Sequence, residues 1–279
     1  MNFPACFTEI LLLLCVPPVV FGLGVWLCRR LFCWFAGDDS GRPLILFTSV
    51  LSVPLREAGH AMMAVLFLHR GEEMRVLDLR AADGEFGFVE HSYNPRNPVA
   101  LLGNFFYALG PVAVGLFAVL ILLLSCFGGI IGPFFDTVEL LGESGADFGA
   151  YAKAAFSLLA DMFTAGHANV VVRILGCVLM AMICLGIYVT PGELTDAISG
   201  ILLTGGLVAL LSGALMLFDD RVTRNVLHGI RSFSTAVSAL FLIVLAFAAA
   251  LVVIAILFGV IRTLFNIDHI EVPDDTQEP

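Results

Sequence analysis

The sequence predicts an all-α, multi-pass membrane bundle with one β-hairpin inserted between its second and third spans. Hydrophobic residues make up 59% of the chain and charged residues only 14%. A soluble globular domain has about half of its residues apolar and about a quarter charged. Several apolar runs also reach the roughly 20 residues that a helix needs to cross the hydrocarbon core of a bilayer. Composition and run length together place the chain in a membrane.

We expect about six transmembrane helices, at residues 10–27, 44–68, 101–127, 170–189, 197–218 and 236–260. The first belongs to an N-terminal part, residues 1–42, and the last to a C-terminal part, residues 219–266. Residues 43–218 form the core of the protein, and residues 267–279 are expected to be an acidic, disordered tail. The formal net charge of −10 excludes nucleic acid as a partner, because the neutralisation of phosphates needs clustered Lys and Arg.

The long polar segment between the second and third spans predicts a β-hairpin at residues 70–93. Apolar and polar side chains alternate in residues 76–80 and 85–89, with the period of a half-buried strand. Asp83 and Gly84 between them favour the positive φ angles of a tight turn.

Three ionisable side chains, Arg56, Glu57 and His60, lie inside the second predicted span. Charged groups are costly in a membrane, so such a cluster marks a candidate functional site. Residues four apart share one face of a helix, so Arg56 and His60 project together with Glu57 beside them. The string R-E-A-G-H matches a zinc-binding H-E-x-x-H helix in which arginine has replaced the first histidine.

Further short strings follow this helix. They are G-F-V-E-H-S-Y-N at residues 87–94, G-N-F-F at 103–106, G-P-V at 110–112 and T-P-G-E-L at 190–194. In their order and spacing, across roughly residues 43–200, the chain resembles the site-2-protease type of intramembrane zinc metallopeptidase, and in particular an uncharacterised bacterial branch of that family. The resemblance implies a helical membrane core with a β-hairpin, located in the bacterial inner membrane.

In an active member of this family, two histidines and a distant carboxylate hold Zn²⁺, and a glutamate activates the bound water. Carried over to this chain, the resemblance implies His60 and Glu193 as metal ligands and Glu57 as the general base. Arg56 stands in place of the first histidine. A guanidinium stays protonated and has no lone pair for a metal, so Arg56 argues against zinc, the cofactor that the resemblance implies. We therefore expect a catalytically impaired pseudopeptidase.

Two further candidates lie near the site in the sequence. His91 could supply a replacement nitrogen for a metal, or it could support the hairpin turn or contact a substrate strand. Asn104 is expected to hold two helices together by a hydrogen bond, as are Thr48 and Ser49.

Glu193 and Asp196 lie beside a Pro-Gly break, where an exposed turn and a buried role are both open. An unpaired Arg56 would be costly inside the membrane. In the family, the carboxylate in the place of Glu193 faces the side of the helix that carries Arg56 here. We therefore predict an ion pair between Arg56 and Glu193 in place of the lost metal.

The expected partners follow from these features. The apolar helices contact the lipid bilayer, and the edge of the hairpin could take up a transmembrane or extended peptide segment as an additional strand. Two other functions stay open. One is an active zinc protease with unusual ligation, and the other is a small membrane transporter whose polar path is lined by Arg56, Glu57, His60 and Glu193.

Overall fold

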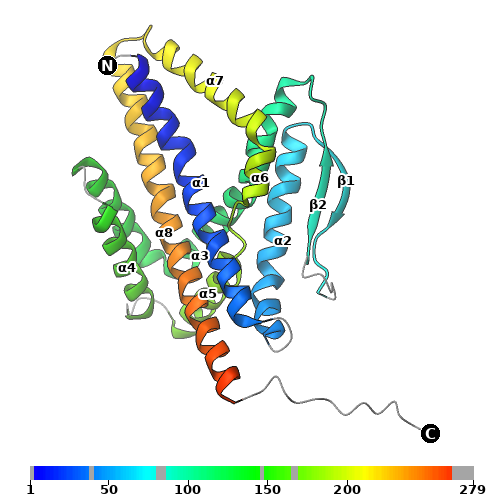
Figure 1. Cartoon of the computed structure of the whole chain (residues 1–279). Coiled ribbons are helices and arrows are strands. Elements are labelled where there is room, and N and C mark those ends of the chain that lie inside the picture. Colours follow the sequence, from blue (N-terminus) through cyan, green and yellow to red (C-terminus); the bar gives the residue numbers. More distant parts are fainter. Residues whose placement is uncertain (1–2, 38–40, 80–85, 145–147, 165–168, 266–279) are drawn as a thin grey trace.

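The computed structural model describes residues 3–37, 41–79, 86–144, 148–164 and 169–265. In chain order, the elements are α1 (Phe3–Ala36), α2 (Arg42–Leu66), β1 (Arg70–Arg75), β2 (Phe88–Ser92), α3 (Pro98–Ser144), α4 (Phe148–Thr164), α5 (Val170–Cys184), α6 (Pro191–Asp196), α7 (Ile198–Leu215) and α8 (Asp220–Leu264). A helical bundle with one small antiparallel sheet is confirmed (Figure 1). The predicted Asp83-Gly84 turn and acidic tail lie outside the described residues.

Among the described residues, four helices are long and apolar enough to cross a membrane: α1, α7, α8 and the segment Pro98–Leu141 of α3. The predicted number of about six is not confirmed. α5 has 15 residues, which rise about 22 Å and fall short of a hydrocarbon core about 30 Å thick. α2 interrupts its apolar surface with Arg56, Glu57 and His60, and it is not among the four.

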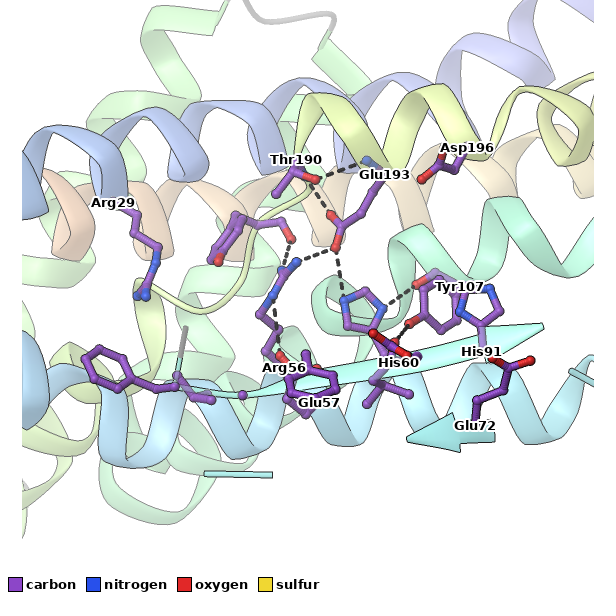
Figure 2. A pocket seen from close by; sticks show the side chains of 17 residues that line it. Arg29, Arg56, Glu57, His60, Glu72, His91, Tyr107, Thr190, Glu193 and Asp196 are labelled. Atoms are coloured by element: carbon purple, nitrogen blue, oxygen red, sulfur yellow. Dashed lines mark hydrogen bonds and ion pairs between the residues drawn. The ribbon is translucent and has the colours of Figure 1, made fainter. Parts of the chain in front are cut away.

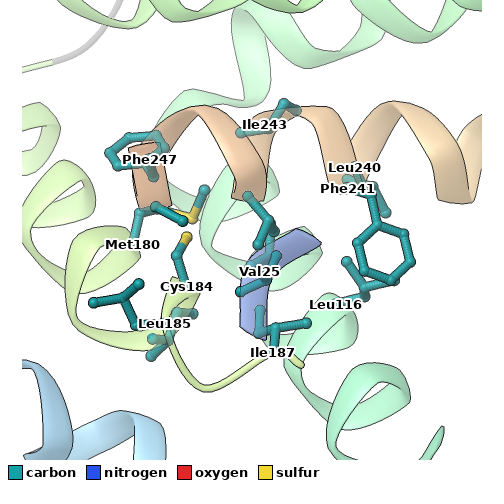
Figure 3. Close-up of a cluster of buried hydrophobic side chains, with 14 of the residues drawn as sticks. Val25, Leu116, Met180, Cys184, Leu185, Ile187, Leu240, Phe241, Ile243 and Phe247 are labelled. Carbon is teal, nitrogen blue, oxygen red and sulfur yellow. The ribbon is translucent and has the colours of Figure 1, made fainter. Parts of the chain in front are cut away.

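The first and last helices of the described chain pack against each other. α1 and α8 run side by side, and α3 and α5 lie against α8 (Figure 1). Buried apolar side chains from all these parts meet in one core, among them Val25, Leu116, Met180, Ile187 and Phe241 (Figure 3). The two ends of the chain therefore complete the core that the middle of the chain begins.

Three helices extend well beyond the apolar segments from which they were predicted, α1 at both of its ends. α3 continues past the predicted third span to Ser144, and the non-helical φ and ψ of Phe127 (−134° and 21°) mark a kink where that span was expected to end. α8 begins at Asp220, before the predicted span at residues 236–260. Hydropathy marks the part of a helix that can lie in the hydrocarbon, but it does not mark the ends of the helix.

The hairpin is present, but its first strand begins earlier than predicted. β1 and β2 pair antiparallel with Arg75 opposite Phe88, whereas the first strand was expected at residues 76–80. All residues of β1 are exposed, and its sequence R-G-E-E-M-R lacks the apolar-polar alternation by which strands are recognised. A shift of register between Gly71 and Glu73 further breaks the period of two.

Glycines let the elements that carry the site touch through their backbones. A Cβ atom on Gly59 of α2 would lie 2.6 Å from the carbonyl carbon of Gly110 in α3. A Cβ atom on Gly186, just after α5, would lie 2.7 Å from the carbonyl oxygen of Ser52 in α2. Only glycine fits at such close approaches. These contacts hold α2 against α3 and against residues 185–190, and so position the R-E-A-G-H string.

Candidate functional site

A polar cavity of about 730 Å³ lies between α2, β2 and α6. In Figure 2, α2 runs along one side of it, α6 lies on the other side, and β2 crosses between them. The cavity brings together most of the residues singled out from the sequence: Arg56, Glu57, His60, His91, Glu193 and Asp196.

Arg56 is held by neighbours from three parts of the chain. Its Nη2 donates to Oε1 of Glu193, so the predicted ion pair is present. Its Nη1 donates to the carbonyl oxygen of Tyr188 at 3.0 Å, and its Cζ lies 4.1 Å from the centroid of the Tyr188 ring. The Nε atom is 3.8 Å from Oε1 of Glu57. The guanidinium therefore has both hydrogen-bond partners and compensating charge, as a buried cation requires.

Glu193 is positioned by the first turn of α6. The backbone N–H of Thr190 donates to Glu193 Oε2 at 2.7 Å, and the backbone N–H of Glu193 donates to Thr190 Oγ1 at 3.1 Å, which is a capping box. The other carboxylate oxygen is left free to face Arg56 and His60. Burial alone would raise the pKa of Glu193, but the hydrogen bond from His60 and the charge of Arg56 lower it to about 2. Glu193 is therefore an anion at neutral pH.

His60 lies against acceptors on both sides of its ring. Its Nε2 is 3.0 Å from Glu193 Oε1, and its Nδ1 is 3.1 Å from the carbonyl oxygen of Tyr107. Each ring nitrogen therefore faces an oxygen atom. The nitrogen that would face a metal thus faces the carboxylate that was predicted as its fellow ligand.

Glu57 is the most deeply buried carboxylate at the cavity, with 3% of its surface exposed. Arg56 Nε lies 3.8 Å from Glu57 Oε1, beyond hydrogen-bonding distance, and no side-chain hydrogen bond joins Glu57 to the other described residues. An acceptor that is buried and lacks a donor at the wall of a cavity is available to a ligand. The prediction of Glu57 as a general base stays a prediction.

His91 is part of a stack of rings rather than a partner of Glu193 among the described residues. Its ring centroid lies 3.9 Å from that of Tyr107 and 4.9 Å from that of His69, and Tyr107 is 4.5 Å from His60. The hydroxyl of Tyr107 also donates to the carbonyl oxygen of Val89 at 2.9 Å, which ties β2 to α3. Burial, followed by the nearby His69 and His60, lowers the pKa of His91 to about 4, so His91 is neutral at pH 7.

The predicted helix-joining hydrogen bonds have mixed outcomes. Asn104 Nδ2 donates to Ser199 Oγ at 3.0 Å and so joins α3 to α7, as expected, outside the cavity. The prediction for Thr48 and Ser49 is wrong, because both hydroxyls donate to the carbonyl oxygen of Ile45 in their own helix. A hydroxyl in a helix interior can always reach the carbonyl one turn earlier, and here that bond is the one formed.

Sequence reasoning missed several residues that build the site. Tyr188 contributes a backbone carbonyl from a non-helical segment, which no side-chain pattern reveals. Tyr107 and His69 carry no motif, although Tyr107 lies close to the glycine crossing in α3 that places it beside His60. Arg29 also lines the cavity. It resembles any basic residue near the end of an apolar helix, and only the packing of α1 reveals its place.

The described residues do not offer a set of zinc donors. No group of three or more His, Cys, Asp or Glu side chains among them has the arrangement of a metal site. The guanidinium of Arg56 occupies the space between Glu193 and Glu57 in which a cation would be compensated. The resemblance to site-2 proteases rests on the sequence strings. Comparisons with family models, with curated proteins and with solved structures find no match to this chain.

Proposed function

We propose that this protein is a membrane-embedded peptide-binding pseudopeptidase, with a site-2-protease-like arrangement in which an arginine takes the place of the metal. The observation that carries the proposal is the double engagement of Glu193 Oε1 by Arg56 Nη2 and His60 Nε2. In a zinc enzyme, the carboxylate and the histidine would both direct lone pairs to the metal. Here the guanidinium of Arg56 supplies the positive charge and forms an ion pair with the carboxylate.

The charges of the site would be compensated without a metal ion. Arg56 compensates Glu193 directly, and Glu57 lies 3.8 Å away on the far side of the guanidinium. A metal ion next to a permanent cation would be repelled. In a zinc enzyme the metal lowers the pKa of a water molecule to make it a nucleophile at neutral pH, and Arg56 opposes the binding of such a metal here.

The strand that borders the cavity supports peptide binding. β2 and the two residues before it line the cavity over residues 86–91. An extended peptide can bind beside a strand through backbone hydrogen bonds, with side chains alternating between two sides. A cavity of about 730 Å³ is within the usual range for a ligand site.

Metal analysis tests the first half of the proposal. The purified protein in detergent should carry far less than one zinc per chain, and Arg56→His should raise the occupancy by placing two imidazoles on one helical face. Arg30→His is the matched control, because Arg30 is exposed on α1 and does not line the cavity. One zinc per unmodified chain, lost on His60→Ala, would contradict the proposal.

Photo-crosslinking tests the second half. A photoreactive amino acid at Phe88, which lines the cavity, should trap peptide segments in cells. The same amino acid at Phe117, which is 64% exposed on α3, is the control for contacts along an apolar helix. Peptide adducts that form equally at both positions, or at Phe117 alone, would argue against binding along β2.

A further inference from the structure

The cavity has opposite charges at its two ends. The order of contacts along it is Arg29, Tyr188, Arg56, Glu193, His60, Tyr107 and His91. Figure 2 shows Arg29 at one end of this order and His91 at the other. Arg29 of α1 lines one end. Its Cζ is 5.6 Å from the centroid of the Tyr188 ring, and Arg56 also packs against this ring. No carboxylate of the described residues pairs with Arg29.

Acidic side chains gather at the other end, around His91. They are Glu72 of β1, Glu90 of β2 and Asp196 at the end of α6, and all three line the cavity. None of them forms an ion pair with a described residue. His91 does not compensate them, because its neutral form is the stable one at pH 7.

The middle of the cavity does not change this polarity. Arg56 and Glu193 satisfy each other there, so neither offers a full charge to a ligand. Within the described part of the chain, a ligand would therefore meet a cation without an ion-pair partner at one end and carboxylates without ion-pair partners at the other, with a strand between them. Glu57, which is buried and has no side-chain hydrogen bond to the other described residues, would accept a hydrogen bond from a ligand between the two ends.

The direction of β2 relative to these ends is fixed by its neighbours. A Cβ atom on Gly87 would lie 2.6 Å from Cγ1 of Val53, which is one helical turn before Arg56, whereas His91 stacks on Tyr107 next to His60. β2 therefore runs from the Arg29 end towards the acidic end. A strand rises about 3.3 Å per residue, so residues 86–91 extend over the length of about five ligand residues.

We propose that the ligand is a short extended peptide with free termini, bound antiparallel to β2, with its C-terminal carboxylate at Arg29 and its N-terminal ammonium at Glu72, Glu90 and Asp196. This inference rests on the proposed function, since it presumes that the cavity binds peptides. It adds that the site recognises peptide ends rather than an internal segment of a longer chain. A carboxylate on a guanidinium and an ammonium among carboxylates are both charge-assisted contacts in a partly enclosed site.

Calorimetric titration of the full-length protein in detergent tests the inference. The probe is the pentapeptide Ala-Thr-Val-Thr-Ala in four forms: free, amidated at the C-terminus, acetylated at the N-terminus, and blocked at both ends. Amidation should weaken binding by about tenfold or more, as expected for a lost charge-assisted contact. Arg29→Gln should bind the free and amidated forms equally, and Arg29→Lys should keep the preference for the free form.

Matched variants separate the two ends. Arg30→Gln removes a neighbouring arginine that lies outside the cavity and should leave the preference for a free carboxylate unchanged. The double variant Glu72→Gln and Asp196→Asn should remove the penalty for acetylation, whereas Glu73→Gln, on the same strand but outside the cavity, should not. Thermal unfolding of each variant shows whether it is folded.

The outcomes distinguish this inference from the proposed function. If all four forms bind the unmodified protein equally, the site binds peptides but the inferred recognition of their ends is wrong. If amidation weakens binding equally in the unmodified protein and in Arg29→Gln, Arg29 is not the carboxylate site. If no form binds, peptide binding itself fails together with the inference.

Discussion

Arg56 of α2 and Glu193 of α6, which lie 137 positions apart in the sequence, form a hydrogen-bonded ion pair inside the bundle. Only 12% and 17% of their side-chain surfaces are exposed. The pair therefore connects the helix with the charged string to the short helix after the Pro-Gly break. Because both charges have left water, each depends on the other far more than two surface charges would.

Removing one partner should cost more stability than removing both. We expect Arg56→Met or Glu193→Gln alone to lower the free energy of unfolding by about 3–5 kcal/mol, since each leaves a buried charge unpaired, and the double variant to lose much less. Titration with SDS in mixed micelles measures these values. The exposed Glu9–Arg231 pair between α1 and α8 is the control, and its cycle should show a coupling of at most about 1 kcal/mol. Strictly additive losses at Arg56 and Glu193 would contradict this expectation.

The close approach of α2 and α3 should make Gly59 sensitive to a single methyl group. Gly59→Ala would place a Cβ atom 2.6 Å from the carbonyl of Gly110, so the helices must separate, at a cost of about 1–3 kcal/mol. Gly205→Ala is the control in α7, because the added Cβ would have no atom of another described element within 4 Å. It should be neutral or stabilise by up to about 1 kcal/mol. Equal unfolding curves for the two variants would mean that α2 and α3 can move apart at Gly59 and Gly110 without loss of stability.

Part of this structure could be predicted from the sequence, because burial in lipid and the cost of unpaired charge act on single residues. Long apolar runs predicted α1, α3, α7 and α8. The cost of an unpaired charge in the membrane predicted an anionic partner for Arg56. Glu193, in the T-P-G-E string that forms the capping box of α6, is that partner. In both cases a short stretch of sequence is compatible with only one arrangement of low free energy.

The rest depended on contacts that have no local pattern. The carbonyl of Tyr188 and the ring of Tyr107 meet the site only because glycines bring three segments into contact. The exposed residues of β1 have no alternating face, so pairing with β2 decides where the strand begins. Arg29 enters the cavity through the packing of α1, which composition does not specify.

Removing the hydroxyl of Tyr107 should loosen β2 while the Tyr107 ring stays in place at the cavity. Tyr107→Phe keeps the ring between His60 and His91 but loses the hydrogen bond to the carbonyl of Val89, at a cost of about 0.5–1.5 kcal/mol. Hydrogen exchange of the amides in residues 88–92 should therefore be faster. Tyr93→Phe is the control. Tyr93 lies at the end of the hairpin, and its hydroxyl forms no hydrogen bond with the other described residues, so this variant should leave the exchange unchanged. Unchanged exchange in both variants would show that β1 alone holds β2.

Mild acid should destabilise the protein through His91. The pKa of His91 is lowered from 6.5 to about 4 in the folded chain, mainly by burial. Between these values the unfolded chain binds a proton that the folded chain does not, so stability falls as the pH drops below about 6.5 and the loss is complete below about 4. We expect a loss of about 1–2 kcal/mol, less than the full shift would give, because the ring is partly exposed.

The variant His91→Phe separates this effect from the other groups that titrate in the same range. It keeps a ring against Tyr107 and His69 but binds no proton, so its free energy of unfolding should depend less on pH between about 6.5 and 4 than that of the unmodified protein. His228→Phe is the matched control, because it replaces an exposed histidine of α8 that is not part of this ring stack. If His91→Phe and the unmodified protein lose stability in parallel, the proton is taken up elsewhere, and the ring stack beside the cavity is not the acid-sensitive part of the fold.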